Sequence, residues 1–179
     1  SSDKAYGSSE VLPYDESHPL QGRYPYDASK SCADLIAQMY AASFDLPVAV
    51  LRCANLYGGG DLNFNRIVPG AILAAWRREP FVIRSDGRFV RDYLYVEDAA
   101  DGYLAVAAKL AADSGLAGEA FNLSAGVRLD VLEMATRILQ AMGRREMELA
   151  SRTDLVPVIL NEASAEIREQ YLDASKVAA

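Results

Sequence analysis

A tyrosine and a lysine, Tyr26 and Lys30, stand four residues apart in this chain, and Ser2 lies 24 residues before the tyrosine. Side chains four residues apart on a helix share one face, so a phenol and an ammonium at this spacing can point into one site. A free tyrosine has a pKa of about 10, and a cation held beside the phenol lowers that value. Such a tyrosine can take a proton from an alcohol, and the Ser2 hydroxyl can orient the same alcohol. The spacing alone is a weak signal in a chain with ten tyrosines, because a half-buried tyrosine above a solvated lysine gives the same pattern.

An acid and a potential base, Asp3 and Lys4, directly follow Ser2. A carboxylic acid and a neutral amine placed together can protonate a leaving hydroxyl and remove a carbon-bound proton. The alternative is an ordinary surface ion pair at the end of a strand.

The elements that must position these residues alternate between helix and strand. Apolar periodicity, turn residues and β-branched runs predict helices over 25–44, 65–77, 97–112 and 129–142, the last closed by Gly143, and a final helix from about 174. Strands are expected at 47–52, 81–83, 89–95, 121–123 and 147–150, with a hairpin turn at Asp86-Gly87, a plain turn at 58–61 and a long functional loop at 7–24. This order indicates an α/β fold with parallel strands.

Composition limits the function classes. About half of the 179 residues are apolar, which indicates a globular domain, and the net charge of −7 makes a nucleic-acid partner unfavourable. The single histidine and the two cysteines, Cys32 and Cys53, lack metal-ligand spacing, so no metal is expected. We interpret both cysteines as free, buried thiols of a cytoplasmic protein. The sequence has no apolar run of membrane-spanning length and no signal peptide, so no membrane partner is expected.

Four motifs occur in order: Ser-Ser-Asp-Lys at 1–4, Tyr-Asp-Ala-Ser-Lys at 26–30, Arg-Cys-Ala-Asn-Leu-Tyr-Gly at 52–58 and Arg-Asp-Tyr-Leu-Tyr-Val-Glu-Asp at 91–98. Together they resemble the extended short-chain dehydrogenase/reductase family, the NAD-dependent epimerases and dehydratases of nucleotide sugars. The resemblance implies the C-terminal part of a Rossmann-type parallel sheet plus a small α/β substrate-binding subdomain, with substrate-binding parts near 58–98 and 144–172. Because no Gly-x-Gly-x-x-Gly follows a strand, we expect 1–179 to be a partial domain, truncated at both ends and inactive by itself.

The resemblance implies catalytic roles for Ser2, Asp3, Lys4, Tyr26 and Lys30, and binding of NAD through Tyr26, Lys30 and Cys53. Tyr26 would take the proton of the sugar C4 hydroxyl during oxidation, and Asp3 and Lys4 would serve the loss of water across C5 and C6, with Lys4 as the base or as the group that stabilises the enolate. The Asp3-Lys4 pair is most similar to CDP-glucose 4,6-dehydratases, which give CDP-4-keto-6-deoxyglucose. A 4-epimerase, a dTDP- or UDP-sugar 4,6-dehydratase, and a non-catalytic binding or scaffold fragment remain alternatives.

The same resemblance assigns substrate binding to Asn55, Arg66, Arg91 and Glu166. Arg91 would clamp the diphosphate, since a guanidinium fits phosphate geometry; a hairpin arginine paired with Asp92 is an equally good explanation of the local sequence. Many epimerases carry an arginine three residues before the acid at 166, where this chain has Ala163, so binding of UDP in the epimerase manner is doubtful. Relatives pair through the helix that carries the Tyr/Lys motif, which implies a homodimer.

Overall fold

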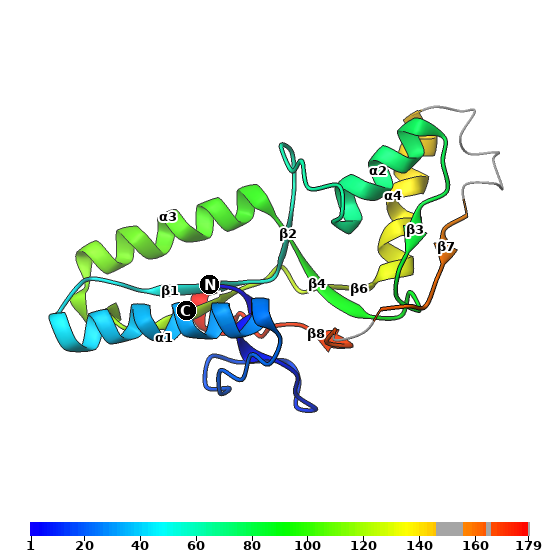
Figure 1. Ribbon diagram of the computed structural model, residues 1–179. Helices are drawn as coiled ribbons and strands as arrows, with labels where there is room; N and C mark the ends of the chain where they lie inside the picture. The colour runs from blue at the N-terminus through cyan, green and yellow to red at the C-terminus, as the bar shows by residue number, and fades with distance from the viewer. Residues whose placement is uncertain (146–155, 164–165, 179) are drawn as a thin grey trace. The chain divides into compact units, whose positions relative to one another are not determined.

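The computed structural model describes residues 1–145, 156–163 and 166–178, and the chain divides into two compact units (Figure 1). Unit 1 comprises Ser1–Gly58, Arg91–Arg128 and Glu169–Ala179, and unit 2 comprises Gly59–Val90 and Leu129–Arg168. The expected strand at 147–150 lies outside the described residues.

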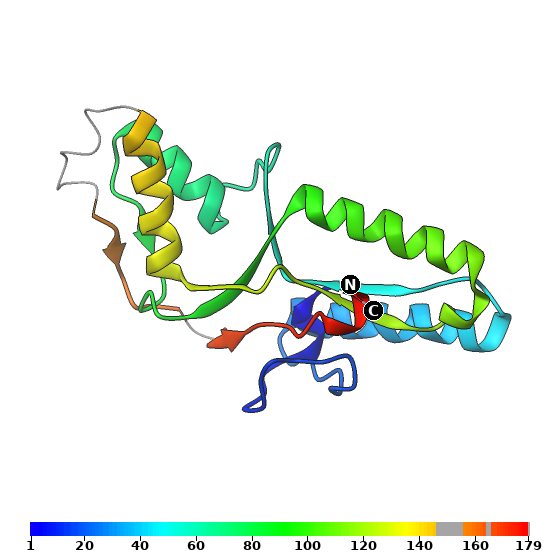
Figure 2. The same cartoon turned by 180° about the vertical axis from the view of Figure 1, so that it is seen from behind.

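Unit 1 is built on two parallel strands, β1 (Val50–Cys53) and β5 (Ala120–Leu123), with Val50 opposite Ala120. All four residues of each strand are buried. Helices α1 (Pro25–Phe44) and α3 (Val96–Ala112) lie on opposite sides of this pair in both views (Figures 1 and 2). The double cover explains why every residue of these strands is buried, with no alternation between a buried and an exposed face, and it confirms the expected α/β fold.

A second sheet has the order β2 (Asn55–Tyr57), β4 (Val90–Tyr95), β6 (Val127–Asp130), and β8 (Glu169–Gln170) also pairs with β4. β2 runs parallel to β4 and places Asn55 opposite Tyr93. Three short helical turns complete unit 1: η1 (Asp3–Tyr6), η2 (Ser114–Leu116) and α5 (Ser175–Ala178). At the start of α5 the Asp173 carboxylate accepts from the Ser175 N–H at 2.8 Å.

Unit 2 pairs two helices, α2 (Ile67–Arg77) and α4 (Val131–Arg145), which lie side by side in both views. Its strands β3 (Val82–Ile83) and β7 (Val158–Ile159) run parallel. The predicted hairpin at Asp86-Gly87 is therefore wrong, because β3 pairs with a strand some 75 residues away and not with β4. The predicted helix end at Gly143 is also wrong, since α4 continues to Arg145.

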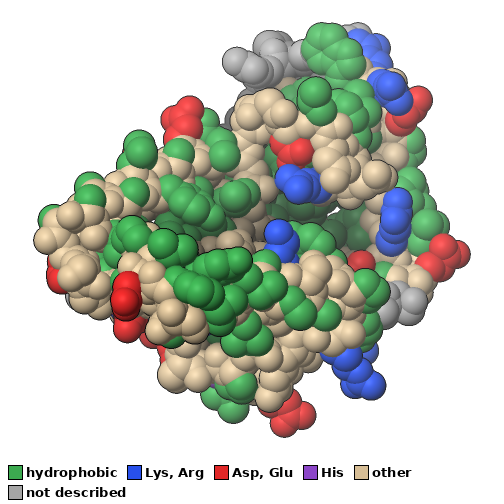
Figure 3. All heavy atoms as spheres, turned by 60° about the vertical axis from the view of Figure 1, so that its left-hand side comes forward, with side chains coloured by type: hydrophobic (Ala, Val, Ile, Leu, Met, Phe, Trp, Pro, Cys, Tyr) green, Lys and Arg blue, Asp and Glu red, His purple; other side chains and the backbone are tan. Residues whose placement is uncertain are grey.

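Helix α1 has the predicted bounds, but it buries the opposite face from the one that its apolar pattern indicates. Pro25 at the first helical position suits the start, and Asp45 in the left-handed region (φ 52°) ends the helix. The buried residues are small or polar: Asp27, Ser31, Asp34 and Ala41. Its large apolar side chains are exposed, and hydrophobic side chains gather on this side of unit 1 in Figure 3: Leu35, Ile36, Met39, Tyr40 and Phe44.

One fully buried side chain, Asn122 on β5, joins segments that are remote in sequence. Its amide nitrogen donates to the backbone carbonyls of Tyr14 and Asp173, both at 2.9 Å, and its oxygen accepts from the Tyr6 hydroxyl at 2.7 Å. Its backbone N–H donates to the Glu16 carboxylate at 2.7 Å. These bonds fix the long 7–24 loop and the start of α5 against β5.

Candidate active site

Asp3 and Lys4 are the first two residues of η1, and Ser2 is its N-cap. Ser2 also forms a β-bridge with Cys53 at the end of β1. The Ser2 hydroxyl donates to the Asp3 carboxylate at 2.9 Å and also accepts from the Lys4 backbone N–H at 3.3 Å, which caps the turn. The structure therefore brings the predicted alcohol-orienting serine and the predicted acid into direct contact.

The Asp3 side chain is 1% exposed, and one of its oxygens, Oδ2, has no hydrogen-bond partner among the described residues. Burial raises the pKa of Asp3, and the charges of Lys4 and Arg91 and the bond from Ser2 only partly offset this effect. A buried carboxyl that favours its protonated form and has an unpartnered oxygen has the properties of a proton donor.

Tyr26 and Lys30 lie on the first turns of α1, where the phenol is 58% exposed. The Lys30 ammonium lies 5.3 Å from the centre of the Tyr26 ring, so the two groups meet on one helix face as their spacing predicts. The ring is not enclosed in hydrocarbon, and it is accessible to a substrate.

Ser31, which the sequence reasoning did not single out, attaches α1 to the turn that carries Ser2, Asp3 and Lys4. Its hydroxyl donates to the Ala5 carbonyl at 2.7 Å and accepts from the Gly22 N–H at 3.1 Å. The Ala5 carbonyl belongs to η1, so this contact fixes the Tyr26 helix against the Asp3 turn.

A buried ion pair holds α1 on β1. Arg52 binds Asp34 through two parallel bonds, with Nε to Oδ2 at 2.9 Å and Nη2 to Oδ1 at 3.0 Å, and both side chains are at most 4% exposed. Arg52 also donates to the Tyr6 hydroxyl at 2.9 Å and lies over the Tyr6 ring. Burial alone would raise the pKa of Asp34, but the bonds from Arg52 outweigh it and the pKa is lowered. Asp34 is four residues beyond Lys30, so helical spacing is the signal that could have found it.

Of the predicted substrate-binding residues, Asn55 and Arg91 belong to unit 1. Asn55 is half-buried on β2, and its amide donates to the Asp92 carbonyl at 3.2 Å. Arg91 is half-buried on β4, and its charge is among those that act on Asp3 and Asp27. Asp92 itself is fully buried: its Oδ2 accepts from the Ser124 hydroxyl at 2.5 Å and from the Leu172 N–H at 3.1 Å.

The two thiols differ. Cys53 is buried at the end of β1, where its sulfur lies 3.8 Å from the Tyr103 hydroxyl, and burial raises the pKa of its thiol. Cys32 is exposed on α1, so the expectation that both thiols are buried is wrong.

Unit 2 carries Arg66 and Glu166. Glu166 lines a hollow of about 410 Å³ together with two aromatic side chains and one arginine, none of them predicted: Phe64, Phe81 and Arg84. Arg66 is 59% exposed just before α2, where it pairs with Asp61 at 3.1 Å, and it is not among the residues that line the hollow. The residues that line the hollow come from segments far apart in the sequence, and local sequence rules do not predict that they meet.

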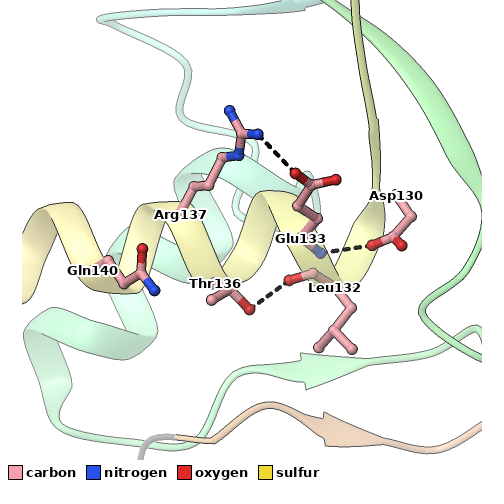
Figure 4. A pocket seen from close by; sticks show the side chains of 6 residues that line it. All are labelled: Asp130, Leu132, Glu133, Thr136, Arg137 and Gln140. Carbon is pink, nitrogen blue, oxygen red and sulfur yellow. Dashed lines mark hydrogen bonds and ion pairs between the residues drawn. The ribbon is translucent and has the colours of Figure 1, made fainter.

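A second hollow of unit 2 lies along the exposed face of α4 (Figure 4). Asp130 accepts from the Glu133 N–H at 2.6 Å, Thr136 donates to the Leu132 carbonyl at 2.7 Å, and Arg137 pairs with Glu133 at 2.7 Å. These bonds stay within the helix and its cap, so this hollow is an ordinary solvated helix face.

Within the described part of the chain, no three His, Cys, Asp or Glu side chains gather as a metal site would require. Nor does any described helix have the length and hydropathy needed to cross a bilayer.

The chain is similar to known proteins in both sequence and structure. Residues 1–124 match the model of the NAD-dependent epimerase/dehydratase family. The chain is 31% identical over 178 residues to a dTDP-glucose 4,6-dehydratase of an Actinoplanes species, covering 99% of this chain and 51% of the relative. It is 33% identical over 149 residues to the low-salt glycan biosynthesis protein Agl12 of Haloferax volcanii, covering 83% and 46%.

Among solved structures, dTDP-glucose 4,6-dehydratase of Bacillus anthracis in complex with NAD superposes with a TM-score of 0.83 at 28% identity, covering 99% of this chain and 52% of that one. The chain thus spans about half the length of the relatives it matches.

Proposed function

Because this chain belongs to the NAD-dependent epimerase/dehydratase family, we propose that it carries the catalytic residues of a nucleotide-sugar 4,6-dehydratase. The observation that carries the proposal is the Asp3 carboxyl, which is buried, favours its protonated form and keeps one oxygen unpartnered among the described residues, beside Lys4 on the same turn. An epimerase needs no acid for a leaving hydroxyl, so this group favours dehydration over epimerisation.

The residues divide the reaction between them. Tyr26, exposed beside Lys30, takes the proton of the sugar C4 hydroxyl, which Ser2 orients. The resulting C4 ketone acidifies the C5 proton, which Lys4 removes, and Asp3 gives its proton to the C6 hydroxyl, which leaves as water. The bond from Ser2 to Asp3 supports this division, because it joins the residue proposed to orient the C4 hydroxyl to the residue proposed to protonate the C6 hydroxyl.

The residues at one end of an NAD site are present. The exposed Tyr26 phenol and the Lys30 ammonium suit the hydroxyls of a nicotinamide riboside, and they fit the cofactor there. NAD, when bound, supplies the oxidation at C4 and the return of hydride to C6. Gly58, Gly59 and Gly60 do not serve as the pyrophosphate turn, because a Cβ on Gly59 or Gly60 would meet no atom within 4 Å and no helix follows closely.

Two observations bear on the nucleotide of the substrate, and they favour different bases. Lys4 favours CDP-glucose, as expected from the sequence, whereas relatives named dTDP-glucose 4,6-dehydratase favour dTDP-glucose. The aromatic hollow of unit 2 with Glu166 supports binding of a nucleoside, since aromatic rings stack on bases and a carboxylate accepts from ribose hydroxyls. Product formation by the full-length protein from CDP-, dTDP- and UDP-glucose decides among the bases, and formation only of a C4 epimer would reject the dehydratase.

The acid role is tested with Asp3→Asn in the full-length protein. We expect the elimination to slow about a hundredfold or more while C4 oxidation is little changed, so that reduced cofactor accumulates. Equal losses in the two steps would remove Asp3 from the elimination.

We further propose that the protein is a homodimer that pairs through α1, whose exposed apolar residues support this assembly. Ile36→Glu should convert it to a monomer in analytical ultracentrifugation. An unchanged sedimentation coefficient would reject α1 as the interface.

A further inference from the structure

A glutamine remote in sequence, Gln170 on β8, contacts both residues of the proposed elimination pair. The side chain is fully buried. Its amide nitrogen donates to the Asp3 backbone carbonyl at 2.9 Å, and its amide oxygen accepts from the Lys4 ammonium. Since the amide has one donor end and one acceptor end, the bond to the Asp3 carbonyl fixes which end faces Lys4.

We propose that Gln170 is a positioning residue that holds Lys4 for the elimination and keeps its amine able to take a proton. The inference rests on the proposed function. An amide oxygen accepts an N–H from a lysine whether that lysine is an amine or an ammonium, because both forms carry donors. The bond therefore occupies an N–H and leaves the lone pair of the neutral amine for the substrate.

The neutrality of Gln170 matters because the charges around Lys4 are already mixed. The carboxyls of Asp3, on the same turn, and of Asp27, on α1, interact electrostatically with the Lys4 ammonium. The Arg91 guanidinium on β4 interacts electrostatically with the same two carboxyls. Asp92, also on β4, acts on Asp3. Asp27 is buried, and burial raises its pKa, so it is a weaker counter-ion than an exposed aspartate. A carboxylate in place of Gln170 would add a full negative charge at a position that contacts the lysine nitrogen and would favour the ammonium.

The first test measures Lys4 directly. In the full-length protein with selectively carbon-labelled lysine side chains, the signal that disappears in Lys4→Arg is that of Lys4. We expect Gln170→Glu to raise the Lys4 titration midpoint by about one pH unit or more. Gln140→Glu, an exposed change of the same chemistry on α4, should leave it in place. Gln170→Met, which keeps the side-chain volume, should increase the mobility of the Lys4 side chain.

The second test follows the two chemical steps in the full-length protein. In Gln170→Glu the pH profile of elimination should move to higher pH with the Lys4 midpoint, while the profile of C4 oxidation stays unchanged. Variants are compared only after circular dichroism shows the native helix content. An unmoved Lys4 midpoint in a folded Gln170→Glu variant of an active dehydratase would overturn the inference alone. A moved midpoint in a protein that dehydrates no sugar nucleotide would overturn the proposed function, and the elimination role of Gln170 with it.

Discussion

The buried pair of Arg52 and Asp34 gives a sharp prediction about stability. In Arg52→Met the Asp34 carboxylate keeps its burial but loses both bonds of 2.9 and 3.0 Å from the guanidinium. Breaking one side of a buried ion pair costs about 3–5 kcal/mol, because an uncompensated charge remains inside the protein. The lost bond to Tyr6 adds about 1 kcal/mol, so we expect a loss of about 4–6 kcal/mol.

The assay is urea unfolding followed by circular dichroism, with hydrogen exchange of α1 and β1 to localise the loss to unit 1. Arg137→Met is the matched control, since its ion pair with Glu133 has a similar distance of 2.7 Å but the arginine is 60% exposed. That control should cost no more than about 0.5 kcal/mol. Replacing both partners, as in Asp34→Leu with Arg52→Met, should cost less than the single change. A loss in Arg52→Met as small as in the exposed control would refute the reasoning.

The same pair fixes the sign of a pH effect. The folded pKa of Asp34 lies below its ordinary value, so its contribution is fully present above about pH 4 and is lost as pH falls through the folded pKa. Asp34→Asn should therefore lower stability at neutral pH and remove this part of the acid sensitivity. An unchanged dependence of the unfolding free energy on pH would contradict the assignment.

Three further outcomes follow from other sites. In Asp92→Asn the amide oxygen should accept the same two hydrogen bonds, from Ser124 and Leu172. Burial raises the folded pKa of Asp92, so the wild type loses stability as pH rises above about 4 and the variant should become more stable relative to it. A stability difference that is constant across pH would contradict this. Gly7→Ala should lower the free energy of unfolding in urea by at least about 3 kcal/mol, because φ is 71° and the added Cβ would lie 2.3 Å from the Gln21 carbonyl oxygen. The control is Gly60→Ala, where φ is 82° but no atom lies within 4 Å of the added Cβ, and it should lower this free energy by about 1 kcal/mol. In the monomeric Ile36→Glu variant, a thiol reagent should label Cys32 in the native state and both Cys32 and Cys53 after unfolding; rapid native labelling of Cys53 would show that β1 opens.

Local patterns predict most elements of this fold. The helices predicted at 25–44 and 97–112 and the strands predicted at 47–52 and 121–123 correspond to α1, α3, β1 and β5. Their signals are Pro25, the acids at the start of the second helix and short runs rich in apolar residues. The short strands β2 and β6 were not predicted, because their residues have no clear alternation and their stability comes from β4 between them. The hairpin prediction failed for the related reason that Asp86-Gly87 has the composition of a turn but β3 finds its partner elsewhere.

The candidate site shows where such reasoning stops. The spacing of Tyr26 and Lys30 predicted their contact, because both lie on one helix. The apolar stripe of α1 lies on its exposed face, since periodicity tells which residues share a face but not what covers it. Gln170 contacts Asp3 across 167 residues, and no local rule connects positions so far apart.

The hydrogen bonds of Asn122 have a kinetic consequence. Its single side chain connects residues near 6, 14 and 173, so the loop ahead of α1 cannot detach without freeing the segment that leads into α5. Deuterium uptake in these segments should accordingly share one opening rate, and Asn122→Leu should split it into several. Unit 1 should also refold slowly, because these contacts join residues that are far apart in the sequence, and stable individual helices do not change this.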